Sequence, residues 1–474
     1  MSPPKSKLAA RLQRLRREEG TAPGNSSAPR GQKNISPKKA GGVNSPDQEL
    51  DRSSGLGRLR QRLEDRGAVY SEIKDAPACP TRLGAPRDLE AMEVRDGICH
   101  ARIQTLDSTQ VHGSWTLAEA HQADARAVEL LAHDASLASV RARDAIFLDT
   151  ETTGLSGGSG TWVYMVGLGR FLPDGSFEMW QGFLRGPEAE KPFMQEVARR
   201  IAEARTVVSF FGKSYDQHRL LDRLRLNGLG SPFEGRPHLD LYYPLKRLLG
   251  GQGPGPYGDH KLQTLEDRLC GHKRVDDLPG SAAPEAWFDF LAQRPHRLEG
   301  VFQHNFLDVL SLVTLFGYLG RALTGSRADG RDLAGPDLLR NLALMQSSVK
   351  ARQYERALEL LTATDFPGQP LAQVLVFDLM RGECLLRTGA VEAGQNLLRT
   401  IHGRAWEERS QEVIQRAGLE SAQILGLSAV QRGELVLAEE AHGWAADWLD
   451  LWPGLVRHRE VQLRLTKALK RVRS

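Results

Sequence analysis

The chain has 474 residues, of which 40 % are apolar and 26 % are charged, and its formal net charge is +4. This length suggests two or three domains with buried cores. No stretch reaches the roughly 18 uncharged apolar residues that a membrane span needs, and the N-terminus lacks the apolar core of a signal peptide, so we predict a cytoplasmic protein without a membrane span.

Four cysteines are spread widely along the chain, at Cys79, Cys99, Cys270 and Cys384. They form no Cys-x-x-Cys pair, which argues against both a zinc site and a disulfide framework. We therefore expect all four to be reduced.

Residues 1–75 are predicted to form a disordered basic tail. They hold 16 Lys and Arg against 9 Asp and Glu and are rich in Ser, Pro and Gly, a composition that cannot bury much apolar surface. Within it, residues 8–17 and 56–63 space leucines three or four apart among arginines. Each segment could form a short basic helix that binds nucleic acid, a partner or an acidic membrane surface, although a solubilising tail explains the same composition.

Residues 88–321 alternate strand-like and helix-like runs, which indicates an α/β domain. Buried strands are expected where apolar residues run together, and helices where they recur every three or four positions. The expected strands are residues 145–148, 162–168, 177–183 and 206–211, and the expected helices are residues 192–204 and 216–225. A meander of strands followed by helices that alternate with strands predicts a mixed sheet with flanking helices.

The first strand ends in two carboxylates, Asp149 and Glu151, within the sequence Asp-Thr-Glu-Thr-Thr-Gly-Leu. Side chains alternate along a strand, so both acids point to one face, with Cα atoms about 6 to 7 Å apart. Their repulsion would be relieved by a hard cation such as Mg²⁺, which prefers oxygen ligands. Gly154 then lets the backbone pass close to a ligand. Taken alone, the pair also fits an ordinary solvated strand end.

Two more acids follow in positions suited to the same chemistry. Asp216 comes just after a buried strand, at the start of a helix whose N-terminus favours phosphate, and Gly212 before it lets the backbone approach a ligand. Asp308 lies four residues after His304 in an amphipathic helix, so the two share one face. A histidine beside a metal-binding acid can act as a general base on water, whereas an isolated histidine is more often a surface or capping residue.

Residues 322–337 are rich in Gly, Asp, Arg and Pro and are predicted to be a linker. Residues 338–474 are rich in Ala, Leu, Glu and Arg, and three segments within them resemble one another: residues 353–361, 389–398 and 433–441. Their spacing of 36 and then 45 residues is near the period of tetratricopeptide-type hairpins, although a plain helical bundle explains the same pattern. We expect a helical scaffold that could bind a protein partner.

Taken in order, these motifs resemble the DEDD superfamily of ribonuclease H-like 3′→5′ exonucleases, and more closely its YprB-like group of predicted exonucleases. The resemblance covers residues 88–320. It is carried by the segments 147–161, Gly212–Asp216, His238–Leu241, Leu262–Glu266, Asp277–Gly280 and His304–Asp308. The spacing from His304 to Asp308 matches members that use Tyr as the helper residue, and Phe211 stands where many second motifs have Asn.

The resemblance implies a ribonuclease H-like mixed sheet and two-metal hydrolysis of the phosphodiester bonds of DNA or RNA. Two Mg²⁺ or Mn²⁺ ions about 3.5 to 4 Å apart would prepare the attacking water and stabilise the leaving oxygen. The implied metal ligands are Asp149, Glu151, Asp216 and Asp308, and His304 would take the proton of the water.

The remaining residues of the implied site would hold the substrate or support the ligands. The substrate-binding set is Thr152, Gly154, Leu155, Gly212 and Lys213. Lys261 is a further candidate for a phosphate contact, although solvated lysines are common. Asp240 would support the site from behind the metal ligands or cap a turn.

Three functions remain open at the level of sequence. The leading one is the 3′→5′ exonuclease. A second is a catalytically idle adaptor, whose sheet domain binds nucleic acid while its helical domain recruits a protein. A third is a structure-selective endonuclease on the same sheet.

Overall fold

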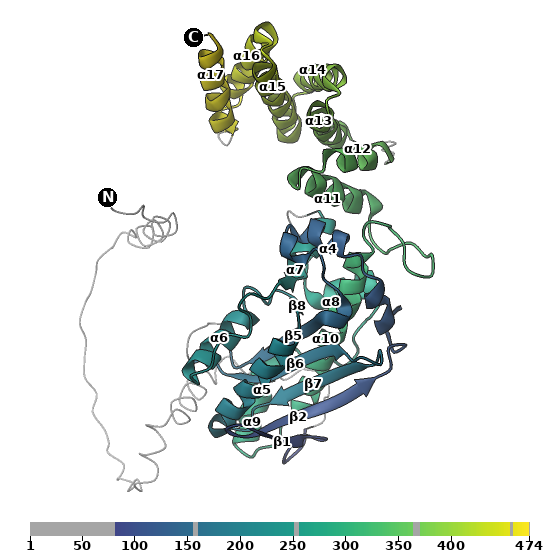
Figure 1. Cartoon of the computed structure of the whole chain (residues 1–474), viewed down its shortest axis with the longest axis vertical. Helices are drawn as coiled ribbons and strands as arrows, with labels where there is room; N and C mark the ends of the chain where they lie inside the picture. Colours follow the sequence, from purple (N-terminus) through teal and green to yellow (C-terminus); the bar gives the residue numbers. More distant parts are fainter. Residues whose placement is uncertain (1–80, 155–159, 251–255, 364–369, 456–457, 474) are drawn as a thin grey trace, which may run out of the picture. The chain divides into compact units, whose positions relative to one another are not determined.

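The computed structural model describes residues 81–154, 160–250, 256–363, 370–455 and 458–473 (Figure 1). The predictions for the basic tail at residues 1–75, its two short helices, Cys79 and Leu155 lie outside these residues.

A seven-stranded mixed sheet forms the centre of the α/β region in the part of the chain that the structure describes. Its order is β1-β2-β7-β6-β5-β8-β9, antiparallel from β1 to β5 and parallel from β5 to β9. The strands are β1 (Glu90–Val94), β2 (Gly97–Leu106), β5 (Ala145–Thr152), β6 (Val163–Phe171), β7 (Phe177–Phe183), β8 (Thr206–Ser209) and β9 (His238–Asp240). A separate ribbon pairs β3 (Val111–His112) with β4 (Trp115–Thr116). The mixed sheet and its meander confirm the predicted fold class.

Helices cover both faces of this sheet (Figure 1). On one face, α10 (Leu298–Gly320) lies so close to β6 that a Cβ added at Gly169 would be 2.7 Å from Val309. On the other, α5 (Glu190–Glu203) places Phe193 beside Gly182 of β7 and Arg200 over the Trp180 ring. The central strands are therefore buried on both sides, which is why they read as continuous apolar runs.

The other helices of the α/β region lie at the ends of the strands. They are α4 (Ala125–Ala132), α6 (Asp216–Leu226), α7 (Tyr242–Leu248), α8 (Leu262–Leu265) and α9 (Ala283–Leu291). A π-helical turn over Glu266–Cys270 continues α8. Such turns are rare and often occur at functional sites, and this one begins with the buried carboxylate of Glu266.

The C-terminal region is all-helical, as predicted. Its helices are α11 (Asp337–Lys350), α12 (Tyr354–Ala363), α13 (Leu371–Thr388), α14 (Val391–Glu407), α15 (Glu412–Arg432), α16 (Leu435–Leu451) and α17 (Arg459–Arg473). Each packs against the next in sequence. Gly389 and Gly433 adopt left-handed conformations at the ends of α13 and α15. Glycine adopts this backbone conformation with less steric strain than other residues. The three similar segments coincide with α12, α14 and α16.

Residues 322–337, between the two regions, pack against the α/β region through Arg327. The Arg327 guanidinium lies 4.5 Å from the centre of the Trp115 ring and pairs with Glu119 at 2.9 Å. Beyond it, α11 contributes Ala343 and Leu344 to the core of the α/β region. The predicted domain limits therefore stay predictions, since α11 is helical yet packs on the sheet domain.

Two negative findings concern the described residues. Cys99, Cys270 and Cys384 are buried and unbonded to one another. No helix in the described ranges is both long and apolar enough to cross a membrane.

Candidate metal-binding active site

The end of β5 supplies the first two acids, and both face α10. One carboxylate oxygen of Asp149 accepts a hydrogen bond from the side-chain amide of Asn305 at 2.8 Å. Glu151 has a ligand oxygen within 4.8 Å of ligand atoms of both His304 and Asp308. The prediction that the two acids share a face of the strand is therefore confirmed, and that face looks toward the helix that carries the fourth acid.

Helix α10 presents His304 and Asp308 on the same side, as their spacing predicts. Nε2 of His304 lies 3.4 Å from Oδ2 of Asp308. The two residues expose only 9 % of their surface each, although they are polar residues in an apolar helix. Buried charged groups need partners. Here His304 and Asp308 lie next to each other, and Glu151 is close to both.

Asp216 reaches the same cluster from the start of α6. Its Oδ1 accepts a short hydrogen bond from the hydroxyl of Thr150, the residue between the two acids of β5. It is 7 % exposed. Gly212 makes this approach possible, because a Cβ there would lie 2.3 Å from Oγ of Ser209 and 3.1 Å from the second Asp216 oxygen.

The electrostatics of the cluster are those of acids crowded together in a buried place. Burial raises the pKa of Glu151 to about 8, and the charges of Asp308 and Asp216 add to this against the opposing effect of His304. Burial, followed by Asp308, Asp216 and Glu151, raises the pKa of Asp149 well above its usual value. Burial also raises the pKa of Asp216 to about 6, despite the Thr150 hydrogen bond. Without a cation, these carboxylates resist full ionisation at neutral pH.

The pKa of His304 is also raised, but by its charged neighbours and against the effect of burial. Burial alone would lower its pKa, but the hydrogen bond to Asp277 and the charges of Asp308 and Glu151 outweigh burial and raise it to about 9. Nδ1 lies 2.8 Å from Oδ2 of Asp277, which fixes the ring and leaves Nε2 toward the acids. In the cation-free protein at neutral pH, His304 therefore carries a proton.

A chain of amides fixes the position of Asp149. Gln181 of β7 donates to the backbone carbonyl of Phe302 at 2.7 Å and to Oδ1 of Asn305 at 3.0 Å, so Asn305 in turn presents its NH₂ to Asp149. Gly167, the β6 partner of Asp149 in the sheet, leaves the room that Asn305 fills, because a Cβ there would lie 2.4 Å from Oδ1. The amide orientation follows from this network, since only one assignment satisfies it.

Arg274 brings a second positive charge to the site, in addition to protonated His304. Its guanidinium donates to Glu266, to Asp277 at 3.0 Å and to Asp308, and its side chain is 5 % exposed. Burial would lower its pKa, but the charges of Asp308 and Glu266 raise it. The carboxylate of Glu266, 0 % exposed, also accepts a hydrogen bond from Ser311 of α10. Arg274 thus neutralises part of the acid cluster in the cation-free protein.

The residues predicted to bind substrate lie around these acids, but several already have partners. The Thr152 hydroxyl lies 2.7 Å from the hydroxyl of Tyr215, which donates to the carbonyl of Gly154 at 2.7 Å. Among the described residues, none lies within 4 Å of a Cβ added at Gly154. The Lys213 ammonium is 3.6 Å from Asp134 and is 40 % exposed.

Asp240 supports the turn before α6. Its carboxylate accepts backbone N–H groups of Phe211 at 2.7 Å, Lys213 at 3.2 Å and Tyr242 at 3.2 Å. Burial raises its pKa, although these hydrogen bonds oppose the change. Lys261 points away into solvent: it is 78 % exposed and 3.6 Å from Asp259.

Sequence reasoning missed several groups that the fold brings to the site. Asn305 and Asp277 lie inside segments on which the resemblance rests, so the sequence contained a reason to consider both as site residues. It contained no such reason for Arg274 and Gln181, since each is distant in sequence from the acids. Tyr215 directly precedes Asp216 and was overlooked.

The residues present fit a divalent cation. All four acids offer oxygen ligands, which suit Mg²⁺ and Mn²⁺, and Asp149 and Asp216 each keep one oxygen free of the hydrogen bonds described above. Glu151, His304 and Asp308 bring ligand atoms within 4.8 Å of one another. A bound cation would relieve the repulsion that raises the carboxylate pKa values.

Two comparisons with known proteins agree with this geometry. Residues 146–320 match the family model of the RNase_H superfamily, so this part of the chain is an RNase H superfamily domain. The chain is also 31 % identical over 207 residues to the uncharacterized protein YprB of Bacillus subtilis (strain 168), a match that covers 41 % of this chain and 46 % of that protein. The chain thus spans about half the length of this relative. The predicted ribonuclease H-like fold and the likeness to YprB are confirmed.

Proposed function

We propose that the RNase H superfamily domain is a metal-dependent nuclease, and specifically a 3′→5′ exonuclease that hydrolyses phosphodiester bonds of DNA or RNA by a two-metal mechanism. The observation that carries this proposal is that Glu151, His304 and Asp308 bring ligand atoms within 4.8 Å of one another, while the charges of Asp216 and Asp308 raise the pKa values of buried Asp149 and Glu151. Structural acids are rarely left to repel one another in this way, whereas catalytic acids that share cations commonly are.

In this proposal Asp149, Glu151, Asp216 and Asp308 hold Mg²⁺ or Mn²⁺. When bound, the cations would lower the pKa of water and neutralise charge that develops on the phosphate and the leaving oxygen. Asn305 holds the Asp149 carboxylate in a fixed orientation, so little reorganisation is needed when a ligand arrives.

His304 serves as the proton acceptor for the attacking water. Asp277 holds its Nδ1–H, so Nε2 faces the acids. Neutralisation of Asp308 and Glu151 would remove the main charges that keep Nε2 protonated, and His304 would then become a base near neutral pH. The charged state of His304 is therefore coupled to cation binding.

Polarity and exonuclease action rest on the resemblance to the DEDD superfamily rather than on the geometry. They are tested with a 5′-labelled single-stranded oligonucleotide of DNA and one of RNA, each with a free or a blocked 3′ end, in Mn²⁺ or in EDTA. A 3′→5′ exonuclease gives a ladder of shortened 5′-labelled products in Mn²⁺ only, and a blocked 3′ end abolishes it.

The matched control is Asp149→Asn, which keeps the side-chain volume and removes the charge. Loss of the ladder in this variant supports the proposal. Shortening in EDTA, or full activity of the variant, would refute it. Cleavage of a circular single strand would instead assign an endonuclease.

We further propose that α11–α17 form a tetratricopeptide-like scaffold that contacts a protein partner. The support is the successive packing of these helices and the coincidence of the three similar segments with α12, α14 and α16. A cytoplasmic location stays a prediction. A pull-down with residues Tyr354–Arg473 tested against the same chain with the Leu437→Asp substitution would report on the scaffold.

A further inference from the structure

A basic cleft lies between α4, α7 and α11. Its volume is about 870 Å³. Helices α4 and α7 both pack against α11 (Figure 1). The lining of the cleft includes His133 at the C-terminal end of α4, Tyr243, Lys246 and Arg247 of α7, and Lys350 at the end of α11.

The charge of this cleft is of one sign. Lys246, Arg247 and Lys350 line it together with Arg416, and no carboxylate is among the described residues that line it. Arg416 is paired with Glu420 at 2.9 Å, so it adds little. Lys350 is exposed and donates to Nδ1 of His133 at 2.8 Å. Burial and the charges of Arg247 and Lys350 lower the pKa of His133 to about 4, as expected where positive charge has no counter-ion.

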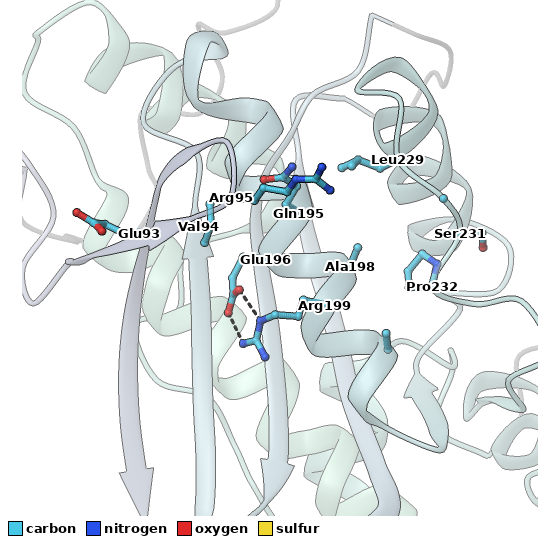
Figure 2. A pocket seen from close by; sticks show the side chains of 12 residues that line it. Glu93, Val94, Arg95, Gln195, Glu196, Ala198, Arg199, Leu229, Ser231 and Pro232 are labelled. Carbon is cyan, nitrogen blue, oxygen red and sulfur yellow. Dashed lines mark hydrogen bonds and ion pairs between the residues drawn. The ribbon is translucent and has the colours of Figure 1, made fainter.

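A second cavity, of about 570 Å³, provides the contrast (Figure 2). It is lined by two arginines, Arg95 and Arg199, and two glutamates, Glu93 and Glu196. Figure 2 shows Arg199 paired with Glu196, at 2.6 Å. Its charges balance, so it offers an anion no particular attraction.

Exposed aromatic rings connect the acid cluster to the basic cleft. Phe211 is 46 % exposed and Tyr243 is 39 % exposed, and their ring centres are 6.5 Å apart with planes inclined at 34°. Phe211 directly precedes Gly212, the residue packed against Asp216. Tyr243 lies on α7 three residues before Lys246 and belongs to the lining of the cleft.

The conformation of Phe211 is one that a bulky residue rarely adopts. Its φ is +60°, and the Asp240 carboxylate holds its N–H at 2.7 Å. A left-handed backbone costs a bulky residue free energy and persists only where the surroundings impose it. The ring also stays in water instead of joining the core, which costs apolar burial. A ring held out at this cost beside the acids is suited to stacking on a planar ligand.

We propose that the basic cleft and the Phe211–Tyr243 ridge bind the single-stranded part of a nucleic acid, whose end lies at the acids. This inference rests on the proposed function for the placement of the strand end. Lys246 and Lys350 neutralise backbone phosphates, while Phe211 and Tyr243 stack on bases. Basic grooves lined with aromatic rings bind single strands in a sequence-tolerant way, because every base has a flat face.

The test is binding, not cleavage, and uses the full chain in EDTA so that hydrolysis does not interfere. A fluorescent 12-nucleotide single strand is titrated and its anisotropy followed at several salt concentrations. The variants are Lys246→Glu with Lys350→Glu, Tyr243→Ala, and Arg95→Glu as the matched charge reversal in the balanced cavity. Thermal unfolding of each variant confirms that it is folded.

The double charge reversal should weaken binding at least tenfold and reduce the slope of log Kd against log salt by about 1.4, the value for two phosphate contacts on a single strand. Tyr243→Ala should weaken single-strand binding about tenfold. Arg95→Glu should change binding less than twofold. A blunt duplex should bind more weakly than the single strand.

Binding by the double variant equal to that of the wild type would overturn the inference, as would equal loss in Arg95→Glu or tighter binding of the duplex. These results are independent of the nuclease proposal. Strand binding that depends on the cleft, with no cleavage in Mn²⁺, would refute the proposed function and leave the binding surface in place. Cleavage in Mn²⁺ together with strand binding that does not depend on the cleft would support the proposed function and overturn the binding surface.

Discussion

Raising the pH should destabilise the cation-free protein, because two buried groups of the acid cluster must lose protons. Burial raises the pKa of Glu151 from 4.5 to about 8, and the pKa of His304 is raised from 6.5 to about 9. Between pH 6.5 and 8.5 the folded protein holds protons at both residues that the unfolded chain has partly or wholly released. Since stability rises with pH only where the unfolded state binds more protons, here it must fall.

The magnitude follows from the same values. Each pKa unit corresponds to about 1.4 kcal/mol, so His304 and Glu151 each contribute a loss of about 2 kcal/mol over this window. Histidines whose pKa is lowered by burial act in the opposite sense, because the unfolded chain still holds part of their protons near pH 6.5. The pKa values of His112 and His238 fall to about 3, so both are neutral in the folded and the unfolded chain above about pH 7.5, and the fall between pH 7.5 and 8.5 is free of their contribution.

The assay is urea unfolding at pH 6.5, 7.5 and 8.5, in EDTA and in excess Mg²⁺. In EDTA the free energy of unfolding should fall by several kcal/mol, and Mg²⁺ should remove most of the fall because it replaces the protons. The double variant Glu151→Gln, His304→Gln should lose most of this fall in EDTA, and Asp149 should account for what remains. A free energy that is constant or rises with pH in EDTA would refute this account of the cluster.

Two further predictions concern contacts of the site, and a third concerns a contact between α15 and α16 and is their control. In Gly167→Ala the new Cβ would lie 2.4 Å from Oδ1 of Asn305. The substitution should therefore cost about 1–3 kcal/mol of stability through overpacking and weaken Mg²⁺ binding measured by calorimetry. Unchanged Mg²⁺ affinity would mean that Asn305 does not orient the Asp149 carboxylate. Arg274→Gln should lower the free energy of unfolding in EDTA by about 3–5 kcal/mol, because Asp308 loses its charged partner. Mg²⁺ should restore much of this loss. Equal losses in both buffers would mean that Arg274 does not neutralise the acids. Gly418→Ala should lower the melting temperature, since a Cβ would meet the Trp448 ring at 2.3 Å, and should leave Mg²⁺ affinity as it is, which makes it the control for general destabilisation.

The sequence predicted the sheet well because its central strands are unambiguous. Residues 145–148 form a buried apolar run, and residues 206–209 are buried around Val207 and Val208, and such short runs can be recognised without tertiary information. Residues 210–211 were predicted to extend the strand and instead leave it, since Asp240 draws the Phe211 backbone into a left-handed turn. Asp240 and Phe211 are 29 residues apart in the sequence, so a pattern of neighbouring residues does not predict their hydrogen bond.

The four acids were visible because each lies at an end or on a face that spacing alone can define. What spacing could not reveal is their neutralisation. Arg274 lies 34 residues from Asp308 and reaches it only because the π-helical turn and the loop after it fold back on α10. The Gln181 and Gly167 contacts with Asn305 likewise depend on which strands are neighbours, which a single sequence does not specify.

The proposed function requires Asp149, Glu151, Asp216 and Asp308 to bind divalent cations together. Electron paramagnetic resonance counts the Mn²⁺ ions that bind when the purified full chain is titrated. We expect two ions per chain in the wild type and the loss of at least one in Asp149→Asn, with Asp259→Asn unchanged as the exposed control. Equal Mn²⁺ binding by the wild type and Asp149→Asn, or no specific binding by either, would show that these acids do not form the proposed site.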